Sequence, residues 1–105
     1  MTIAIVKYNA GNTRSVACAL QRLGYDSMVT DDEKTLQKAD RVIFPGVGEA
    51  STAMRYLTEK GLDTIIRRLE QPFLGICLGV QLMCSFSEEN NTRTLGIFDV
   101  PVKKF

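Results

Sequence analysis

The sequence predicts a three-layer α/β/α sandwich built around a mostly parallel β-sheet. Short apolar runs alternate with longer segments in which apolar residues recur at helical spacing, and this alternation is typical of βαβ units with right-handed crossovers. The run Ile3-Ala4-Ile5-Val6 is apolar throughout, as expected of a strand covered on both faces. The chain has 105 residues, which is the size of one domain or part of one.

The elements follow in order. The first helix is expected to have Thr13 as its N-cap and to end at Gly24. Strands are expected at 3–6, 27–29, 41–44 and 73–76, with further strand-like segments at 95–98 and 100–105. Helices are expected from the first turn after Thr13 to residue 23 and at 35–39, 50–57, 62–69 and 78–86, with a polar turn at 30–34 and a polar loop at 87–94. The last segment, 100–105, has no evident pairing partner, which indicates the front part of a larger domain.

Composition excludes several classes of function. Thirteen basic and twelve acidic residues give a formal net charge of +1, so no strong field favours a nucleic acid or a membrane surface. No apolar run approaches the roughly 20 residues that span a bilayer. Three unpaired cysteines predict free thiols and a cytoplasmic location. Histidine is absent and no cysteine pair has ligand spacing, so neither a metal site nor another cofactor is expected.

The segment Gly75-Ile76-Cys77-Leu78-Gly79 falls where a strand should turn sharply into a helix. This is the Gly-x-nucleophile-x-Gly pattern of a nucleophile elbow, with cysteine in place of serine. The glycines are required because the strand and helix backbones pass close together there. The N–H of Leu78 is placed to stabilise an oxyanion next to Cys77. A small buried cysteine between two turn glycines remains the alternative interpretation.

Two further features favour catalysis at Cys77. Gln81 lies four residues later, on the same face of the predicted helix, where its amide could meet a polar substrate. The segment Pro45-Gly46-Val47-Gly48 ends the preceding strand, and its glycines allow the N–H of Val47 to become a second oxyanion donor. Each feature alone is compatible with an exposed glutamine or an ordinary tight turn. The remaining cysteines, Cys18 and Cys84, are expected to be packing residues.

The sequence resembles the class I (triad-type) glutamine amidotransferases, whose nucleophile signature matches residues 74–83 almost residue for residue. The resemblance implies that Cys77 attacks the side-chain amide of glutamine and that Val47 and Leu78 hold the oxyanion. It also implies that the glutamyl part of the substrate is contacted by Gly46, Gly48, Gln81 and Glu89. The catalytic His and Glu of the family match no residue here, so the chain resembles the N-terminal part of a single amidotransferase domain, and we expect it to be inactive alone.

Residues 44–50, 7–16, 87–89 and 95–98 are similar to one branch of that family, the glutaminase subunits of histidine biosynthesis. These subunits form a heterodimer with a cyclase subunit, a (βα)8 barrel that receives the ammonia. The resemblance places Asn9, Gly11 and Asn12 on the docking face. Lys7 departs from the branch pattern, which leaves the local contacts of the docking loop open. Phe86, before Ser87-Glu88-Glu89, is a second departure, where the family has an Arg or a similar residue.

Three other functions remain open from the sequence. One is a class I amidotransferase of purine or cytidine nucleotide synthesis, which the Pro-Gly-Val-Gly segment disfavours. A second is a cysteine-elbow stress protein of similar topology that acts without glutamine. The third is a flavodoxin-like module that cradles phosphate, although the chain lacks the glycine-rich motifs that open a phosphate-binding helix.

Overall fold

The computed structural model describes residues 1–103 and contains a four-stranded parallel sheet with strand order β2-β1-β3-β4. The strands are β1 (Ile3–Val6), β2 (Met28–Thr30), β3 (Arg41–Phe44) and β4 (Phe73–Gly75). The register pairs Ile5 with both Val29 and Ile43, and Ile43 with Leu74. All carboxyl ends therefore lie at one edge of the sheet, where ligands of such folds bind.

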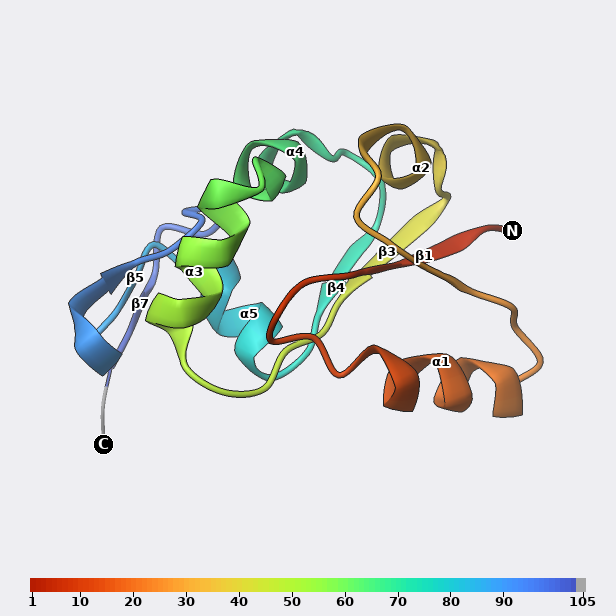
Figure 1. The fold of residues 1–105 in the computed structure, drawn as a ribbon, viewed down its shortest axis with the longest axis horizontal. Coiled ribbons are helices and arrows are strands. Elements are labelled where there is room, and N and C mark those ends of the chain that lie inside the picture. Colours follow the sequence, from red (N-terminus) through yellow and green to blue (C-terminus); the bar gives the residue numbers. More distant parts are fainter. Residues whose placement is uncertain (104–105) are drawn as a thin grey trace.

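Helices cover both faces of this sheet, as predicted (Figure 1). On one face lies α1 (Thr13–Arg22). On the other face lie α2 (Glu33–Lys38), α3 (Ala50–Glu59), α4 (Leu62–Arg68) and α5 (Leu78–Met83). The three-layer arrangement predicted from the alternating pattern is thus observed. No helix within residues 1–103 is long and apolar enough to cross a membrane.

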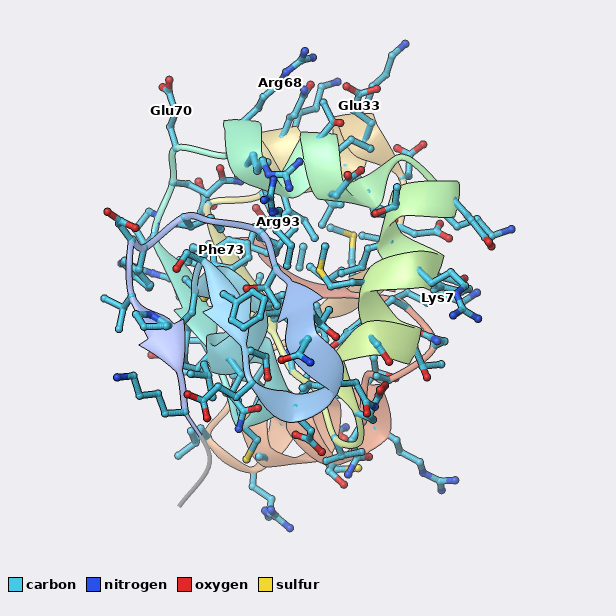
Figure 2. The ribbon with its side chains drawn as sticks, turned by 90° about the vertical axis from the view of Figure 1, so that its left-hand side faces the viewer. Lys7, Glu33, Arg68, Glu70, Phe73 and Arg93 are labelled. Atoms are coloured by element: carbon cyan, nitrogen blue, oxygen red, sulfur yellow. The ribbon has the colours of Figure 1, made fainter. Side chains whose placement is uncertain are left out.

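Alternation along the strands divides the core between the two faces. Val42 and Phe44 of β3 join the large cluster beneath α2 to α5, whereas Ile43 faces α1. Phe44 is fully buried and its ring lies 5.1 Å from that of Tyr8 and 5.8 Å from that of Phe73. Figure 2 shows the charged side chains of Glu33, Arg68 and Glu70 pointing outward around this core. The central strand β1 is apolar and buried along its whole length because both of its faces are covered.

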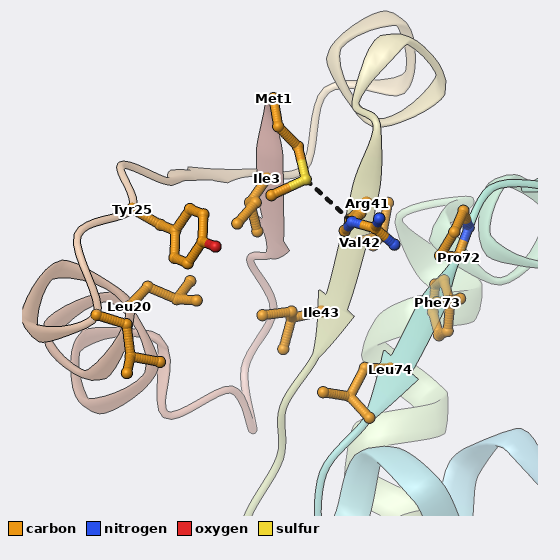
Figure 3. A pocket seen from close by; sticks show the side chains of 11 residues that line it. Met1, Ile3, Leu20, Tyr25, Arg41, Val42, Ile43, Pro72, Phe73 and Leu74 are labelled. Carbon is orange, nitrogen blue, oxygen red and sulfur yellow. Dashed lines mark hydrogen bonds between the residues drawn. The ribbon is translucent and has the colours of Figure 1, made fainter.

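The face covered by α1 is less complete than the opposite one. No residue of α1 is fully buried, and an apolar groove of about 410 Å³ runs between α1 and β4 (Figure 3). Leu20, Ile43 and Leu74 line it, and Leu74 is 57% exposed. The groove does not include Cys77.

The predicted helix boundaries need several corrections. α2 begins at Glu33 inside the predicted turn, because the Asp32 carboxylate caps it by accepting from the Thr35 N–H at 3.0 Å. The N-cap of α1 is Asn12, not Thr13, whereas Gly24 ends that helix at φ +90°, as predicted. α5 ends at Met83 and does not reach residue 86.

The segment after α5 differs most from the prediction. A second sheet, with order β6-β5-β7, is formed by β5 (Phe86–Ser87), β6 (Thr92–Arg93) and β7 (Pro101–Val102). The expected strand at 95–98 is wrong, and the predicted loop at 87–94 contains β6 and the 3₁₀ turn η1 (Glu89–Asn91). The segment 100–105 does have a partner, since β7 pairs in parallel with β5, while its residues 104–105 lie outside the described chain.

One set of hydrogen bonds explains these differences. The backbone N–H groups of Leu95, Gly96 and Phe98 donate to the carbonyls of Leu82, Cys84 and Met83 at 2.8–2.9 Å. The last carbonyls of a helix need such partners because no intrahelical donor reaches them. Residues 95–98 therefore satisfy the end of α5 instead of joining a sheet.

Candidate active site

Cys77 stands at the junction of β4 and α5 in a strained backbone conformation, with φ 53° and ψ −119°. A non-glycine residue with positive φ is uncommon, and such outliers gather at functional sites. The residue is exposed and its thiol is free. An exposed cysteine at a strained turn between strand and helix is what the elbow pattern predicts. The alternative of a sealed, purely structural cysteine is therefore not what the structure contains.

The two elbow glycines are required by close backbone packing. A Cβ at Gly79 would overlap the carbonyl of Phe44, at the end of the neighbouring strand. A Cβ at Gly75 would lie 2.6 Å from Met83 Sδ and 2.9 Å from the Val80 nitrogen. These distances are too short for real carbon atoms, so α5 can pack this close to β3 and β4 only with glycine at both positions.

The two predicted oxyanion donors are both engaged in hydrogen bonds in this structure. The N–H of Leu78 donates to the Gly46 carbonyl at 3.0 Å, and the N–H of Val47 donates to the Ala10 carbonyl at 2.8 Å. The Gly46 carbonyl and the Val47 N–H belong to the same peptide group. One peptide orientation thus occupies both donors at once.

The buried side chain of Tyr8 holds the segment Pro45–Gly48 in place. Its hydroxyl donates to the Pro45 carbonyl at 2.6 Å, and only 6% of the residue is exposed. Burial raises the pKa of the Tyr8 phenol well above its ordinary value. A Cβ at Gly46 would collide with the Tyr8 hydroxyl, so this glycine is required by a close approach. Sequence reasoning missed Tyr8, because its partner lies 37 residues away.

Glu49 follows that segment and was also missed. Its carboxylate caps α3 by accepting from the Thr52 N–H at 2.8 Å, and it further accepts from the hydroxyl of Ser51 and the side-chain amide of Asn90. These hydrogen bonds, with that from Ser51 contributing most, lower the pKa of Glu49 to about 2. The available signal was an acidic residue three positions before a helical N–H, which is a capping pattern.

The expected substrate-binding residues lie in three segments: Gly46 and Gly48 in the loop between β3 and α3, Gln81 on α5 and Glu89 in η1. Gln81 is half-buried on α5, one turn after Cys77, and its N–H donates to the Cys77 carbonyl at 3.3 Å. Glu89 is exposed at the start of η1, and its N–H donates to Ser87 Oγ at 3.2 Å. Gly48 has φ +111°, a conformation that favours glycine. The turn η1, which carries Glu89, packs against α3, the helix that begins two residues after Gly48.

The residues expected to dock a partner lie on the loop between β1 and α1. Asn9 donates from its side-chain amide to the Thr52 carbonyl at 3.3 Å, which connects this loop to α3. Gly11 donates to the Tyr8 carbonyl at 3.3 Å, and Asn12 caps α1 without a side-chain hydrogen bond. Asn9 and Asn12 are exposed, and Gly11 is partly so.

Of the other two cysteines, one is buried and one is exposed. Cys84 is buried, as expected, but it lies beyond the end of α5. Cys18 is exposed, so the prediction that it is a packing residue is wrong; it occupies a solvent-facing position of α1. Within residues 1–103, no group of three His, Cys, Asp or Glu side chains is arranged to hold a metal ion.

The fold and the elbow define an α/β protein with a cysteine presented between strand and helix. The model of the SNO glutamine amidotransferase family matches residues 9–105, and the chain belongs to this family. A solved structure described as "Crystal structure of glutamine amidotransferase" superposes with a TM-score of 0.80 at 21% identity, over 97% of this chain and 56% of that one. That likeness supports the fold.

Curated relatives are more similar in sequence. The imidazole glycerol phosphate synthase subunit HisH of Bacteroides fragilis is 61% identical over 105 residues, and that of Bacteroides thetaiotaomicron is 59% identical. The subunit of the same name from Idiomarina loihiensis is 46% identical over 104 residues. The alignments cover 99–100% of this chain but only 53–54% of these relatives. The chain thus spans about half the length of the curated relatives it matches.

Proposed function

We propose that this chain is the nucleophile-bearing, N-terminal part of the single amidotransferase domain in a glutaminase subunit of imidazole glycerol phosphate synthase. The observation that carries the proposal is the exposed Cys77 at φ 53°, held between two glycines that permit no side chain. The shared name of the relatives favours this function over an amidotransferase of purine or cytidine nucleotide synthesis.

The proposed reaction converts glutamine and water into glutamate and ammonia. The Cys77 thiolate attacks the side-chain amide carbon, and the carbonyl oxygen becomes an oxyanion in a tetrahedral intermediate. The C–N bond then breaks, ammonia leaves with an added proton, and a glutamyl thioester remains until water hydrolyses it. The chain contains no histidine, so a histidine that carries these proton transfers, as the family resemblance implies, would have to come from outside residues 1–105.

In this proposal the peptide between Gly46 and Val47 must rotate before the oxyanion can be stabilised. Rotation breaks the bonds to Leu78 and Ala10 together, which frees the Leu78 N–H and turns the Val47 N–H to the side now held by the carbonyl. Glycine at position 46, whose ψ angle changes in this rotation, lowers its cost. Two converging N–H donors then stabilise the oxyanion with Leu78 and Val47 in their proposed roles.

The remaining assignments belong to the same proposal. Gly46, Gly48, Gln81 and Glu89 would form the site for the glutamyl part of the substrate. Asn9, Gly11 and Asn12 would contact a (βα)8-barrel cyclase subunit, which would receive the ammonia in the cytoplasm. Their exposure on the loop before α1 supports this placement.

Alkylation by the diazo ketone analogue of glutamine, diazo-oxo-norleucine, tests the proposal. We expect Cys77 to be labelled at a rate that saturates with reagent concentration and is slowed by glutamine, and Cys77→Ser to remain unlabelled. Indifference of Cys77 to this reagent, with ready oxidation by peroxide, would instead favour a cysteine-elbow stress protein. With glutamine alone, the chain should release little glutamate, because general acid and base catalysis contributes about 10²–10⁴-fold.

A further inference from the structure

The side chain of Glu49 connects two segments that come from distant parts of the sequence. It stands directly after Pro45–Gly48, and its carboxylate accepts from Asn90, which lies 41 residues later in η1. Asn90 is the immediate neighbour of Glu89, which the proposed function places against the glutamyl part of the substrate. A single carboxylate thus joins the oxyanion segment to the turn that carries a substrate-binding residue.

The two oxygens of Glu49 have different partners. Oε2 accepts from the Thr52 N–H and caps α3, which fixes the carboxylate to the first turn of that helix. Oε1 accepts from Ser51 Oγ and from Asn90 Nδ2. A hydrogen bond to an ionised carboxylate is about twice as strong as one between neutral groups. The cap therefore orients one oxygen while the other holds Asn90.

The turn around Asn90 has an unusual backbone that needs such support. Asn90 has φ 56° and ψ 26°, and Asn91 has φ 46°, so two successive residues are left-handed. Other hydrogen bonds of the turn run to residues close in sequence: the Glu89 N–H donates to Ser87 Oγ at 3.2 Å, the Asn91 N–H to the Glu88 carbonyl at 3.3 Å, and Thr92 Oγ1 to the carbonyls of Glu89 and Asn90 at 3.3 Å. The N–H of Glu88, just before the turn, donates to the Val102 carbonyl at 2.9 Å. These bonds shape the turn, and the Asn90 side chain fixes it to the start of α3.

We propose that Glu49 is a positioning residue: by holding Asn90 it fixes Glu89 relative to the segment Pro45–Gly48, and so sets the affinity for the glutamyl part of the substrate. This inference rests on the proposed function. It assigns to Glu49 an effect on substrate binding that is separate from its role as the cap of α3.

Two substitutions separate these roles. Glu49→Asp retains an N-capping carboxylate, as Asp32 provides for α2, but is one methylene too short to reach Asn90 as well. Asn90→Gly removes the side-chain amide and retains the left-handed backbone, which glycine adopts freely. The matched control is Asn91→Gly, at a neighbouring residue that is also left-handed and whose N–H donates to the Glu88 carbonyl.

The test is the concentration dependence of Cys77 labelling by diazo-oxo-norleucine, followed by mass spectrometry. Loss of one charge-assisted hydrogen bond that orders a binding turn should raise the half-saturating concentration about three- to tenfold in Glu49→Asp and in Asn90→Gly. The maximal labelling rate and the rate with iodoacetamide, which has no glutamyl part, should stay within about twofold. Because both variants remove the same bond, the double variant should match either single variant.

The outcomes are distinct. If wild type saturates and both variants saturate at the same concentration as Asn91→Gly, Glu49 is only a helix cap and the inference is overturned. A fall in labelling by iodoacetamide as well would also overturn it, because the loss would then be structural. If the wild-type chain itself shows no saturation, the proposed function fails and this inference fails with it.

Discussion

The hydroxyl of Tyr8 donates a 2.6 Å hydrogen bond to the carbonyl of Pro45, and this bond connects the segment Pro45–Gly48 to the loop that follows β1. The same loop supplies the Ala10 carbonyl that accepts from Val47. Two residues of one loop therefore hold both ends of the turn that precedes Gly48. The orientation of the Gly46–Val47 peptide depends on a segment that is distant in sequence.

Replacing Tyr8 with phenylalanine should destabilise the fold by about 1–2 kcal/mol, because a buried carbonyl loses its partner while the ring packing on Phe44 remains. Urea unfolding followed by circular dichroism measures this difference. Tyr25→Phe is the matched control, since Tyr25 is 47% exposed. An equal and small effect of both substitutions would contradict the role assigned to the Tyr8 hydroxyl.

Alkaline pH should act through the same phenol. Burial raises the pKa of Tyr8 in the folded state, whereas the unfolded chain ionises near its ordinary value of about 10. The contribution of Tyr8 to stability is thus complete below pH 10 and is lost as pH rises toward the folded pKa. We expect the stability advantage of wild type over Tyr8→Phe to shrink above pH 10; an advantage that stayed constant from pH 8 to 11 would contradict this.

Acid should act through Glu49 in the opposite direction. Its pKa is about 2 in the folded state against an ordinary 4.5, so its contribution is complete above pH 4.5 and is lost as pH falls toward 2. Asp32 and Asp40 also have lowered pKa values and contribute to acid sensitivity in every variant. Glu49→Gln should therefore lose less stability than wild type between pH 5 and pH 2, as measured by thermal unfolding, while Glu59→Gln at the exposed end of α3 should behave like wild type.

The parallel sheet and the elbow were predictable because their signals are local. The strand signal is the apolar run Ile3–Val6, and the elbow signal is the pair of glycines that flank Cys77. Each signal is contained within a few consecutive residues. The small second sheet was not predictable, since its two-residue strands are set by pairing between residues 15 apart, Phe86 and Pro101. Periodicity cannot be read from two residues.

The orientation of the peptide between Gly46 and Val47 could not be predicted from the sequence, for a different reason. A peptide that follows a glycine can adopt two orientations at low cost. In the observed orientation the Val47 N–H donates to the Ala10 carbonyl, which lies in a loop distant in sequence. The sequence predicts Val47 and Leu78 as backbone donors next to Cys77, and that assignment stays a prediction. The structure shows that the Gly46–Val47 peptide group is bonded in a way that occupies both N–H groups.

Gly79→Ala should prevent normal folding, since the added methyl group would overlap the backbone carbonyl of Phe44 in the centre of the molecule. Backbone cannot yield as a side chain does, so we expect a loss of about 3 kcal/mol or more in unfolding free energy. Val80→Ala is the matched control, at an exposed position of the same helix. A Gly79→Ala variant that unfolds at the same urea concentration as Val80→Ala would show that α5 can move away from β3.

The strained backbone of Cys77 should reverse the usual order of stability of alanine and glycine variants. The conformation at φ 53° and ψ −119° is accessible to glycine but costs other residues about 1–3 kcal/mol. Cys77→Gly should therefore be more stable than Cys77→Ala by about 1 kcal/mol, even though glycine ordinarily weakens a folded chain through its larger unfolded-state entropy. Both variants lack the thiol, so their difference in urea midpoint reports the backbone alone. If Cys77→Ala were the more stable, the elbow would be relaxed in solution, and the presentation of the Cys77 thiol would not depend on stored strain.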